Sequence, residues 1–399
     1  MEHPSQLPLV REGRLDDFAL AIDASFFDRA LTDPGALLAA FDEVPTAWLD
    51  DNPRYLMARA LANGFKRPHT PIAEGVFVRF AEWVASQESP AARDILGVLT
   101  TRMRALRSAG RYADSLVTAD SIAGVIDSAE DTSGFDDVIP STLVDMGIAR
   151  LLAGDVRGAI GAFGDAHRRA HVAGHAIVPF VGAFTAAAFL FDGNVEAARE
   201  SLTLDPLAPA NAPPSLAAVY RESGVAAAAL IRLEGGERPI AGEMPPDLSH
   251  VAMWWLTEHL RARRALLWGD AVAAAATLDT ILRRESSMTG ARSFAGVVLH
   301  EDLAKLYLST GSLSEARAVL AAPPLVEPSE RSLALRARIA LAGGRPADAR
   351  AIVIDAESRF PRRHATSVSL RLLRAAAEHA LGNDEVVDAH LRWAAGAIG

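Results

Sequence analysis

Residues 146–166 read MGIARLLAGDVRGAIGAFGDA, and this stretch decides the fold. Small and apolar side chains recur at helical spacing on both sides of Gly154. Glycine interrupts helices because its backbone is conformationally permissive, so a single glycine between two such runs indicates a turn. The stretch therefore predicts two helices joined by a tight turn.

The same unit recurs along the chain. Seven glycines each end one apolar helical stretch and precede another, namely Gly110, Gly154, Gly193, Gly269, Gly311, Gly344 and Gly382. Most of the gaps between them are about 40 residues long, which indicates a helical repeat. The one long gap is about two such units, with Gly235 near its middle. Strand signals are nearly absent, so we expect an all-α fold.

Fixed offsets from these glycines carry similar side chains. The position seven residues before the glycine is small in six of the seven units, where the two helices of a pair need to approach closely. It holds Met103, Gly147, Ala186, Ala262, Ala304, Ala337 and Ala375. We expect the positions five, nine and twelve residues after the glycine to share the face that packs on the preceding helix. The position five after the glycine holds Ser115, Ala159, Ala198, Ala274, Ala316, Ala349 and Val387. The position nine after it holds Ala119, Phe163, Leu202, Leu278, Leu320, Val353 and Leu391. The position twelve after it holds Ile122, Ala166, Asp205, Ile281, Pro323, Ala356 and Ala394.

This pattern resembles the tetratricopeptide repeat (TPR). Units of that family have a small residue in the first helix, a Gly-Asp type turn, and an alanine and a large apolar residue in the second helix. The best matches are residues 146–166 and LAKLYLSTGSLSEARAVL at 303–320, where Tyr307 takes the family's aromatic position. Phe189 takes it in the unit around Gly193. The resemblance implies a TPR-like α-α superhelix, a solenoid of antiparallel helix pairs.

The repeat pattern is clear in only part of the chain, which suggests a division into three segments. We expect an N-terminal extension at 1–14, degenerate N-terminal helical repeats at 15–100, and TPR-like helical repeats at 101–399. Two segments rich in proline and glycine interrupt the array, TLDPLAPANAPPS (203–215) and GGERPIAGEMPPD (235–247). We interpret them as long links between helix pairs. A hinge within 203–248 is the alternative.

The composition limits the possible functions. The 399 residues carry a formal net charge of −10 and no cysteine, which excludes disulfides, thiolate nucleophiles and Cys-based zinc sites. Phosphate contacts need clustered positive charge, so we expect no direct nucleic-acid binding by this chain. The N-terminus has no apolar signal core, and no stretch offers the ~20 apolar residues of a membrane span. We therefore expect a cytoplasmic protein with no membrane contact.

Motifs that carry chemistry are missing from the sequence. Lys66 and Lys305 both lie outside the Gly-Lys-Ser/Thr pattern of a phosphate-binding loop. His300-Glu301 begins a zincin motif, but Ala304 occupies the position of the second metal ligand. We therefore expect no enzyme activity, no cofactor and no metal.

Two polar patterns remain. His167, His171 and His175 would line one helix face if the helix continued through them, which leaves metal binding as an alternative. Ala173-Gly174 resembles a helix end, however, so we interpret the histidines as polar residues at a helix C-terminus. We interpret the acidic pairs near expected helix ends as solvated caps. These pairs are Asp16-Asp17, Asp50-Asp51 and Asp136-Asp137.

Three phrases are similar to the helical-repeat sensor of bacterial LuxR-type regulators of the MalT-like group. They are LDDNPRYLMARALA (49–62), LRSAGRYADSLVTADSI (106–122) and DAHRRAHVAGHAIVPFVGAFTAAAFLFDGNVEAARESL (165–202). The family's upstream ATPase and its C-terminal helix-turn-helix, with a Leu-Thr-x-Arg-Glu stretch, are not in this sequence. The resemblance implies a non-catalytic sensing module in transcription regulation. A stand-alone scaffold or adaptor that mediates protein–protein interaction is the alternative.

A solenoid binds a peptide, a protein or a small effector on its concave face. The first helix expected at 250–267 carries aromatic anchors beside several arginines, which suit a peptide or an anionic effector. The residues of this possible groove are Trp254, Trp255, His259, Arg261, Arg263 and Arg264. We expect at least one of the two tryptophans to line the groove. The alternative is that the tryptophans are core and the arginines are solvated.

Overall fold

The computed structural model describes most of the chain, and the described part is helical. It covers residues 6–67, 72–130, 132, 134–204, 215–234, 237, 253–284, 293–321, 329–360 and 364–398. These residues form twenty-one helices and no strand, which confirms the expected all-α class. By its internal contacts the chain divides into two compact units, Met1–Thr257 and Glu258–Gly399.

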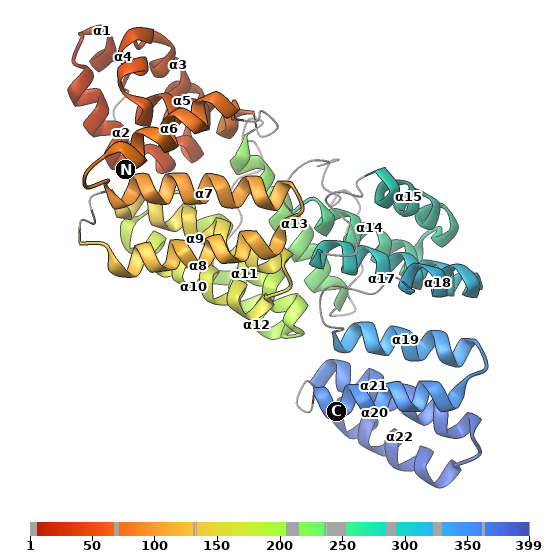
Figure 1. Cartoon of the computed structure of the whole chain (residues 1–399). Coiled ribbons are helices and arrows are strands. Elements are labelled where there is room, and N and C mark those ends of the chain that lie inside the picture. Colours follow the sequence, from red (N-terminus) through yellow and green to blue (C-terminus); the bar gives the residue numbers. More distant parts are fainter. Residues whose placement is uncertain are drawn as a thin grey trace. The chain divides into compact units, whose positions relative to one another are not determined.

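The first unit runs from α1 to the beginning of α14 (Figure 1). Its helices are α1 (Leu7–Arg11), α2 (Leu15–Thr32), α3 (Pro34–Glu43), α4 (Thr46–Asp51), α5 (Pro53–Lys66), α6 (Glu74–Ser86), α7 (Ala92–Ser108), α8 (Tyr112–Ser128), α9 (Phe135–Leu152), α10 (Val156–Ala173), α11 (Val178–Asp192), α12 (Val195–Leu204) and α13 (Leu216–Glu234). The expected extension at 1–14 thus contains a helix, α1, and its Val10 is buried.

The second unit contains most of α14 and the helices that follow it. They are α14 (Trp255–Trp268), α15 (Ala271–Arg284), α17 (Phe294–Ser309), α18 (Leu313–Leu320), α19 (Glu330–Ala342), α20 (Pro346–Arg359), α21 (His364–Ala380) and α22 (Asp384–Ile398). Most of the two expected links, at 205–214, 235–236 and 238–247, lies outside the described residues, and so does Gly235. The expected hinge within 203–248 therefore stays a prediction.

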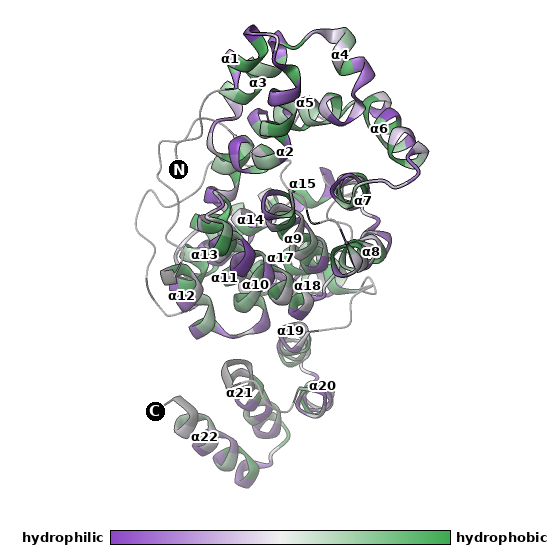
Figure 2. Cartoon of the chain, turned by 90° about the vertical axis from the view of Figure 1, so that its left-hand side faces the viewer, coloured by the Kyte–Doolittle hydropathy of each residue, from purple (hydrophilic) through white to green (hydrophobic). Residues whose placement is uncertain are grey.

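The helices are amphipathic. Figure 2 shows that most of them carry both hydrophobic and hydrophilic residues, as expected for helices that bury one face. Within the described part of the chain, no helix combines the length and the apolar character that crossing a membrane requires.

The seven repeat glycines all lie between consecutive helices, which confirms the predicted turns. Six of them adopt a left-handed backbone with φ between 68° and 90°. At the α9–α10 turn, Gly154 has a φ of 90°, and Asp155 accepts a hydrogen bond from the amide of Gly158 at 2.9 Å. Glycine thus ends the first helix and aspartate caps the second. Because these turns are so short, the packed helices of a pair run antiparallel.

Small side chains let the paired helices approach closely. All seven residues at the position seven before the glycine are buried. Gly147 shows the reason most directly, because a Cβ atom there would lie 2.3 Å from the ring of Phe163 on the partner helix. Phe163 in turn stacks on Phe184 of the next pair, with ring centroids 5.7 Å apart. The ring of Phe163 therefore contacts both its partner helix within the pair and the first helix of the next pair.

The packing face predicted for the second helices is largely present. Five of the seven residues at the position five after the glycine are buried, namely Ser115, Ala159, Ala198, Ala316 and Ala349. Ala274 and Val387 are half-buried. Asp205 and Pro323, at the position twelve after the glycine, lie outside the described residues.

Leu391 is an exception in the last helix. Its side chain is 44% exposed, so the prediction that it packs on the preceding helix is wrong. The neighbouring His390 is buried instead, with its Nδ1 3.2 Å from Nη1 of Arg371 on α21. Successive helical residues project about 100° apart, so α22 turns His390 toward α21 and Leu391 away from it.

Replacing Gly147 with alanine tests the close approach of α9 and α10. We expect Gly147→Ala to lower the free energy of unfolding by about 1–3 kcal/mol, because the new methyl group overlaps a buried ring. Denaturant titration measures this change. Gly161→Ala in α10 is the matched control, since a Cβ atom there meets nothing within 4 Å. It should stabilise the protein by about 0.5–1 kcal/mol. Equal effects of the two substitutions would contradict the packing role of Gly147.

Candidate functional site

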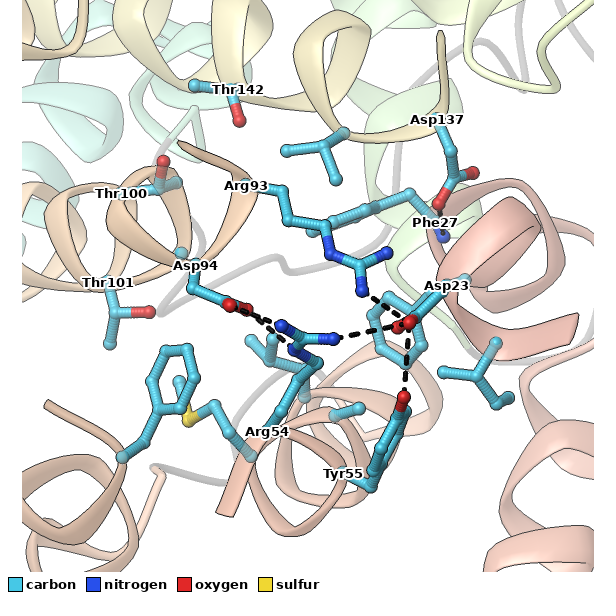
Figure 3. Close-up of a pocket in the computed structure, with 18 of the residues that line it drawn as sticks. Asp23, Phe27, Arg54, Tyr55, Arg93, Asp94, Thr100, Thr101, Asp137 and Thr142 are labelled. Atoms are coloured by element: carbon cyan, nitrogen blue, oxygen red, sulfur yellow. Dashed lines mark hydrogen bonds and ion pairs between the residues drawn. The ribbon is translucent and has the colours of Figure 1, made fainter. Parts of the chain in front are cut away.

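A cavity lies inside the first unit, between α2, α5, α6, α7 and α9 (Figure 3). Its cavity volume is about 90 Å³, and the value rises to about 720 Å³ when all the space between the lining atoms and at the open mouth is counted. Its apolar wall consists of Ile22, Phe26, Phe27, Met57, Ala58, Leu61, Phe80 and Val138. Its polar lining consists of Asp23, Arg54, Tyr55, Arg93, Asp94, Thr100, Thr101, Arg104, Asp137 and Thr142. Apolar walls with a limited set of fixed polar groups are typical of ligand sites.

The wall contributed by α2 depends on a break in that helix. Ser25 has non-helical backbone angles, with φ −156° and ψ 31°. The turn after a break has amides that need new acceptors. Asp137 of α9 provides them, because its carboxylate accepts hydrogen bonds from the amides of Phe27 and Asp28, both at 2.8 Å. A carboxylate from a distant segment thus caps the second half of α2 and fixes the wall of the cavity.

The position of Asp137 corrects one interpretation made from the sequence. We expected the pair Asp136-Asp137 to be a solvated cap, and Asp136 is exposed. Asp137, however, is only 4% exposed and caps another helix. His175 lies beside it, with Nε2 3.4 Å from Oδ1 of Asp137. The Nδ1 of His175 accepts a hydrogen bond from the amide of Ile177, so the neutral ring carries its proton on Nε2, toward the carboxylate.

Four charged side chains from three helices form an ion network at the cavity: Asp23, Arg54, Arg93 and Asp94 (Figure 3). Arg54 lies between the two carboxylates. Its Nε donates to Oδ1 of Asp94 at 2.8 Å, its Nη2 donates to Oδ2 of Asp94, and its Nη1 lies 3.2 Å from Oδ2 of Asp23. Arg93 donates to the same oxygen of Asp23. Two positive and two negative charges therefore compensate each other.

Tyr55 completes this network as a neutral donor. Its hydroxyl donates to Oδ2 of Asp23 at 3.1 Å. Burial, together with the charge of Asp23, raises the pKa of Tyr55 to about 12, so the phenol keeps its proton at neutral pH. Burial acts to lower the pKa of Arg54, but the hydrogen bonds and charge of Asp94 outweigh it and raise that pKa. Tyr55 and Arg54 thus both keep their protons at neutral pH.

A second buried ion group stands behind the cavity. Arg104, which lines the cavity, donates to Asp145 of α9 through Nε at 2.9 Å and also through Nη2. Arg107 lies 3.3 Å from the other oxygen of Asp145. Burial alone would raise the pKa of Asp145, but the two arginines lower it. Arg104 is therefore already engaged and is not a free cation for a ligand.

Thr100 and Gly97 of α7 give the cavity its remaining features. Thr100 is 6% exposed, and its hydroxyl is buried without a hydrogen-bond partner. Such a group costs about 1–3 kcal/mol in a folded protein, so its presence in a cavity favours a role in binding. Gly97 lies close to the ring of Phe80, which a Cβ atom would touch at 3.4 Å. The same helix thus carries an unpaired buried hydroxyl and a position without a side chain.

The tryptophans expected to line a groove are buried. Trp254 is 6% exposed and Trp255 is fully buried, with its ring centroid 5.0 Å from that of Phe191. The expectation that at least one of them lines an accessible groove is therefore wrong. Every residue from Met253 to Thr257 is buried, so the start of α14 is covered on all sides. Neither indole is available as an anchor for a ligand.

The other residues of that expected groove lie in the second unit. They are His259, Arg261, Arg263 and Arg264, and each is buried or half-buried. His259 is buried and its Nδ1 pairs with Asp302 of α17; burial lowers the pKa of His259 and the carboxylate opposes this shift. Arg261 pairs with Glu258 one turn earlier in α14. These two side chains are thus engaged with carboxylates of their own unit.

The three spaced histidines do not share one helix face. The rings of His167 and His171 lie on α10 with centroids 5.9 Å apart. The helix ends at Ala173, and Gly174 follows with a φ of 66°, so His175 leaves the helix face as we expected. Among the residues that the structure describes, no group of three or more His, Asp or Glu side chains is placed to hold a metal ion.

Sequence reasoning missed the cavity, although one quoted phrase contains part of it. The phrase LDDNPRYLMARALA (49–62) holds the lining residues Arg54, Tyr55, Met57, Ala58 and Leu61. Their partners lie on helices distant in the sequence. A usable signal was the placement of Arg54 and Arg93 in the first turns of α5 and α7, where the helix dipole disfavours a positive charge. Such a local conflict indicates a tertiary partner or a site.

Replacing the free hydroxyl tests whether the protein keeps it at a cost. We expect Thr100→Val to raise the free energy of unfolding by about 1 kcal/mol, because valine has the same shape without an unpaired polar group. Thr101→Val is the control, since that residue is only half-buried, and it should change stability by less than about 0.5 kcal/mol. Chemical denaturation measures both. If Thr100→Val destabilised the protein, the hydroxyl would already form a hydrogen bond within the protein and would not be free to bind a ligand.

No protein-family model matches the chain, and no curated protein matches it. What the site does must therefore be argued from its own geometry.

Proposed function

We propose that the chain is a non-catalytic binding module, a TPR-like helical array whose first unit binds a small ligand in the cavity. The observation that carries this proposal is the cavity itself, with its apolar wall, compensated ion network and buried hydroxyl. In its fuller form, the proposal makes the chain the effector-sensing region of a LuxR-type transcriptional regulator. As such a regulator, the protein would be located in the cytoplasm.

The repeat geometry supports the TPR-like part of the proposal. Six turn glycines have a left-handed backbone, and the residue seven before each of the seven glycines is buried. The contact between Gly147 and Phe163 brings the helices of one pair together, and the stacking of Phe163 on Phe184 joins that pair to the next. Arrays of this kind present partners with a preformed surface rather than a reaction centre.

The chemistry of the cavity supports binding rather than catalysis. Asp23 and Asp94 each accept hydrogen bonds from arginine, and Asp137 accepts two from backbone amides. A general base needs a lone pair that is free to take up a proton from the substrate. Both oxygens of Asp94 and of Asp137 are engaged in this way, so these two carboxylates are suited to fixing the shape of the cavity.

One connection favours a sensor over a passive scaffold. The broken helix α2 forms a wall of the cavity and is also tied to later repeats. Asp137 of α9 caps it, and Asp28 of α2 accepts a hydrogen bond from the amide of Ala176, just before α11, at 2.7 Å. A ligand that shifts α2 would therefore act directly on α9 and on the start of α11. A regulator needs such a connection between its effector site and the rest of the array.

A stand-alone scaffold or adaptor is the second candidate, and one observation favours it. Several large apolar side chains of α21 and α22 are 40–45% exposed, namely Leu372, Val386, Leu391 and Trp393. Large exposed apolar side chains can mark a protein-binding surface. A regulator would carry a DNA-binding helix-turn-helix in the same polypeptide, so the codons that adjoin this coding stretch in the gene separate the two candidates.

A neutral apolar dye tests the binding role. N-phenyl-1-naphthylamine fluoresces strongly in apolar surroundings, so we expect a saturable rise in its emission when it is titrated with the protein. Gly97→Leu fills the cavity and should weaken this binding at least about tenfold. Circular dichroism checks that the variant stays helical.

The matched control is Gly124→Leu on α8, outside the cavity, where a Cβ atom meets nothing within 4 Å. It should bind the dye as the unsubstituted protein does. If the dye does not bind, or if Gly97→Leu and Gly124→Leu bind it equally well, the cavity is not a ligand site.

A further inference from the structure

We infer that the ligand of this cavity is electrically neutral, with an apolar, ring-sized body and one hydrogen-bonding group, a hydroxyl or a carbonyl. This inference rests on the proposed function, because it concerns the chemistry of the same site. It is carried by a contrast: the charged groups of the cavity are paired inside the protein, whereas a buried hydroxyl beside them is not.

The charges that line the cavity sum to zero, and each is held by the protein. Three are negative and three positive, namely Asp23, Asp94, Asp137, Arg54, Arg93 and Arg104. The ion network accounts for four of them. Arg104 is bound to Asp145, and Asp137 accepts two backbone amides. Each charged group that lines the cavity therefore already has a hydrogen-bond partner within the protein.

An anion is the natural competitor, because Arg54 and Arg93 are near, but it would compete with Asp23 for them. That carboxylate accepts from Arg54, Arg93 and the hydroxyl of Tyr55 through the same oxygen. Its side chain is only 17% exposed, so the displaced charge would stay largely buried without its donors. Removing one partner of a buried ion pair is costly for this reason.

A cation would compete with an arginine of the network in the same way. It would need to replace Arg54 between the two carboxylates, although Arg54 binds Asp94 with two parallel N–H groups and Asp23 with a third. Paired donation of this kind is among the strongest hydrogen-bonding arrangements in proteins. A small cation without that planar fork would not match the same acceptors.

The polar group of the ligand is assigned to Thr100. Its hydroxyl is buried and unpaired, and Thr142 of α9 also lines the cavity, on the helix facing α7. In Figure 3 the oxygens of both threonines point into the space between these two helices. A hydroxyl both donates and accepts, so a ligand carbonyl or hydroxyl can satisfy it without introducing charge.

The body of the ligand is assigned to the apolar wall. Phe26 and Phe27 after the break in α2 form one side, and Met57 and Phe80 form another. Aromatic side chains bind flat apolar groups through area and ring–ring contacts. Gly97 lies against Phe80, because a Cβ atom there would touch the ring at 3.4 Å.

A set of naphthalene derivatives tests whether the cavity prefers a neutral, an anionic or a cationic ligand, because the compounds share the naphthalene ring and differ in charge. Each competes against N-phenyl-1-naphthylamine at neutral pH: 2-naphthol with a neutral hydroxyl, 2-naphthoate as the anion, 2-naphthylmethylamine as the cation, and naphthalene without a polar group. We expect 2-naphthol to displace the dye at a concentration at least about tenfold lower than either ion requires. Thr100→Val should remove the advantage of 2-naphthol over naphthalene, while naphthalene itself displaces the dye as before.

The outcomes distinguish the two proposals. If 2-naphthoate or 2-naphthylmethylamine competes as well as 2-naphthol, the cavity binds ligands but the inference of a neutral ligand is wrong. If Thr100→Val leaves the advantage of 2-naphthol intact, Thr100 is not the group that receives it, and the inference also fails. If the dye binds without dependence on Gly97, the proposed function fails together with the inference.

Discussion

The close approach of the two helices in each pair is the constraint on which the rest of the structure depends. Gly147 leaves no room for a Cβ atom against Phe163, and the equivalent positions in the other units are buried and mostly small. Because Phe163 also stacks on Phe184, the distance within one pair fixes where the next pair packs. Turn glycines with a left-handed backbone make such tight pairing possible, since other residues adopt that backbone only at a cost.

The cavity lies where this regular packing is relaxed. Helix α2 breaks at Ser25, and the large side chains of Phe26, Phe27 and Met57 line the space beside α2 and α5. The space that results is bounded by ion pairs rather than by apolar contacts alone. Buried ion pairs add little to stability, but they restrict geometry and exclude charge, which are useful properties in a site that selects a ligand. The unpaired hydroxyl of Thr100 lowers the stability of the free protein slightly, and a ligand that forms a hydrogen bond with it would restore that stability.

The repeats could be predicted from the sequence, whereas the site could not. The turns followed from local rules, because glycine and the spacing of small residues act within one helix pair, as at Gly147 and Gly154. Trp254 and Trp255 were misjudged because aromatic residues beside arginines fit a buried helix start as well as a groove. Asp137 was misjudged because the amides that it caps lie in α2, 109 and 110 residues away in the chain. Contacts at that separation leave no local pattern; only the arginines in the first turns of α5 and α7 indicated that distant partners exist.

The most direct test of this account is a crystal structure of the protein with 2-naphthol. The account predicts that the ring lies between α2, α5 and α7, against Phe80, with its oxygen within hydrogen-bond distance of Oγ1 of Thr100. It also predicts that the pairs of Arg54 with Asp94 and with Asp23 stay intact. A cavity that stays empty while the ring binds elsewhere would contradict the account. A ring that enters only by separating Arg54 from Asp94 would contradict it as well.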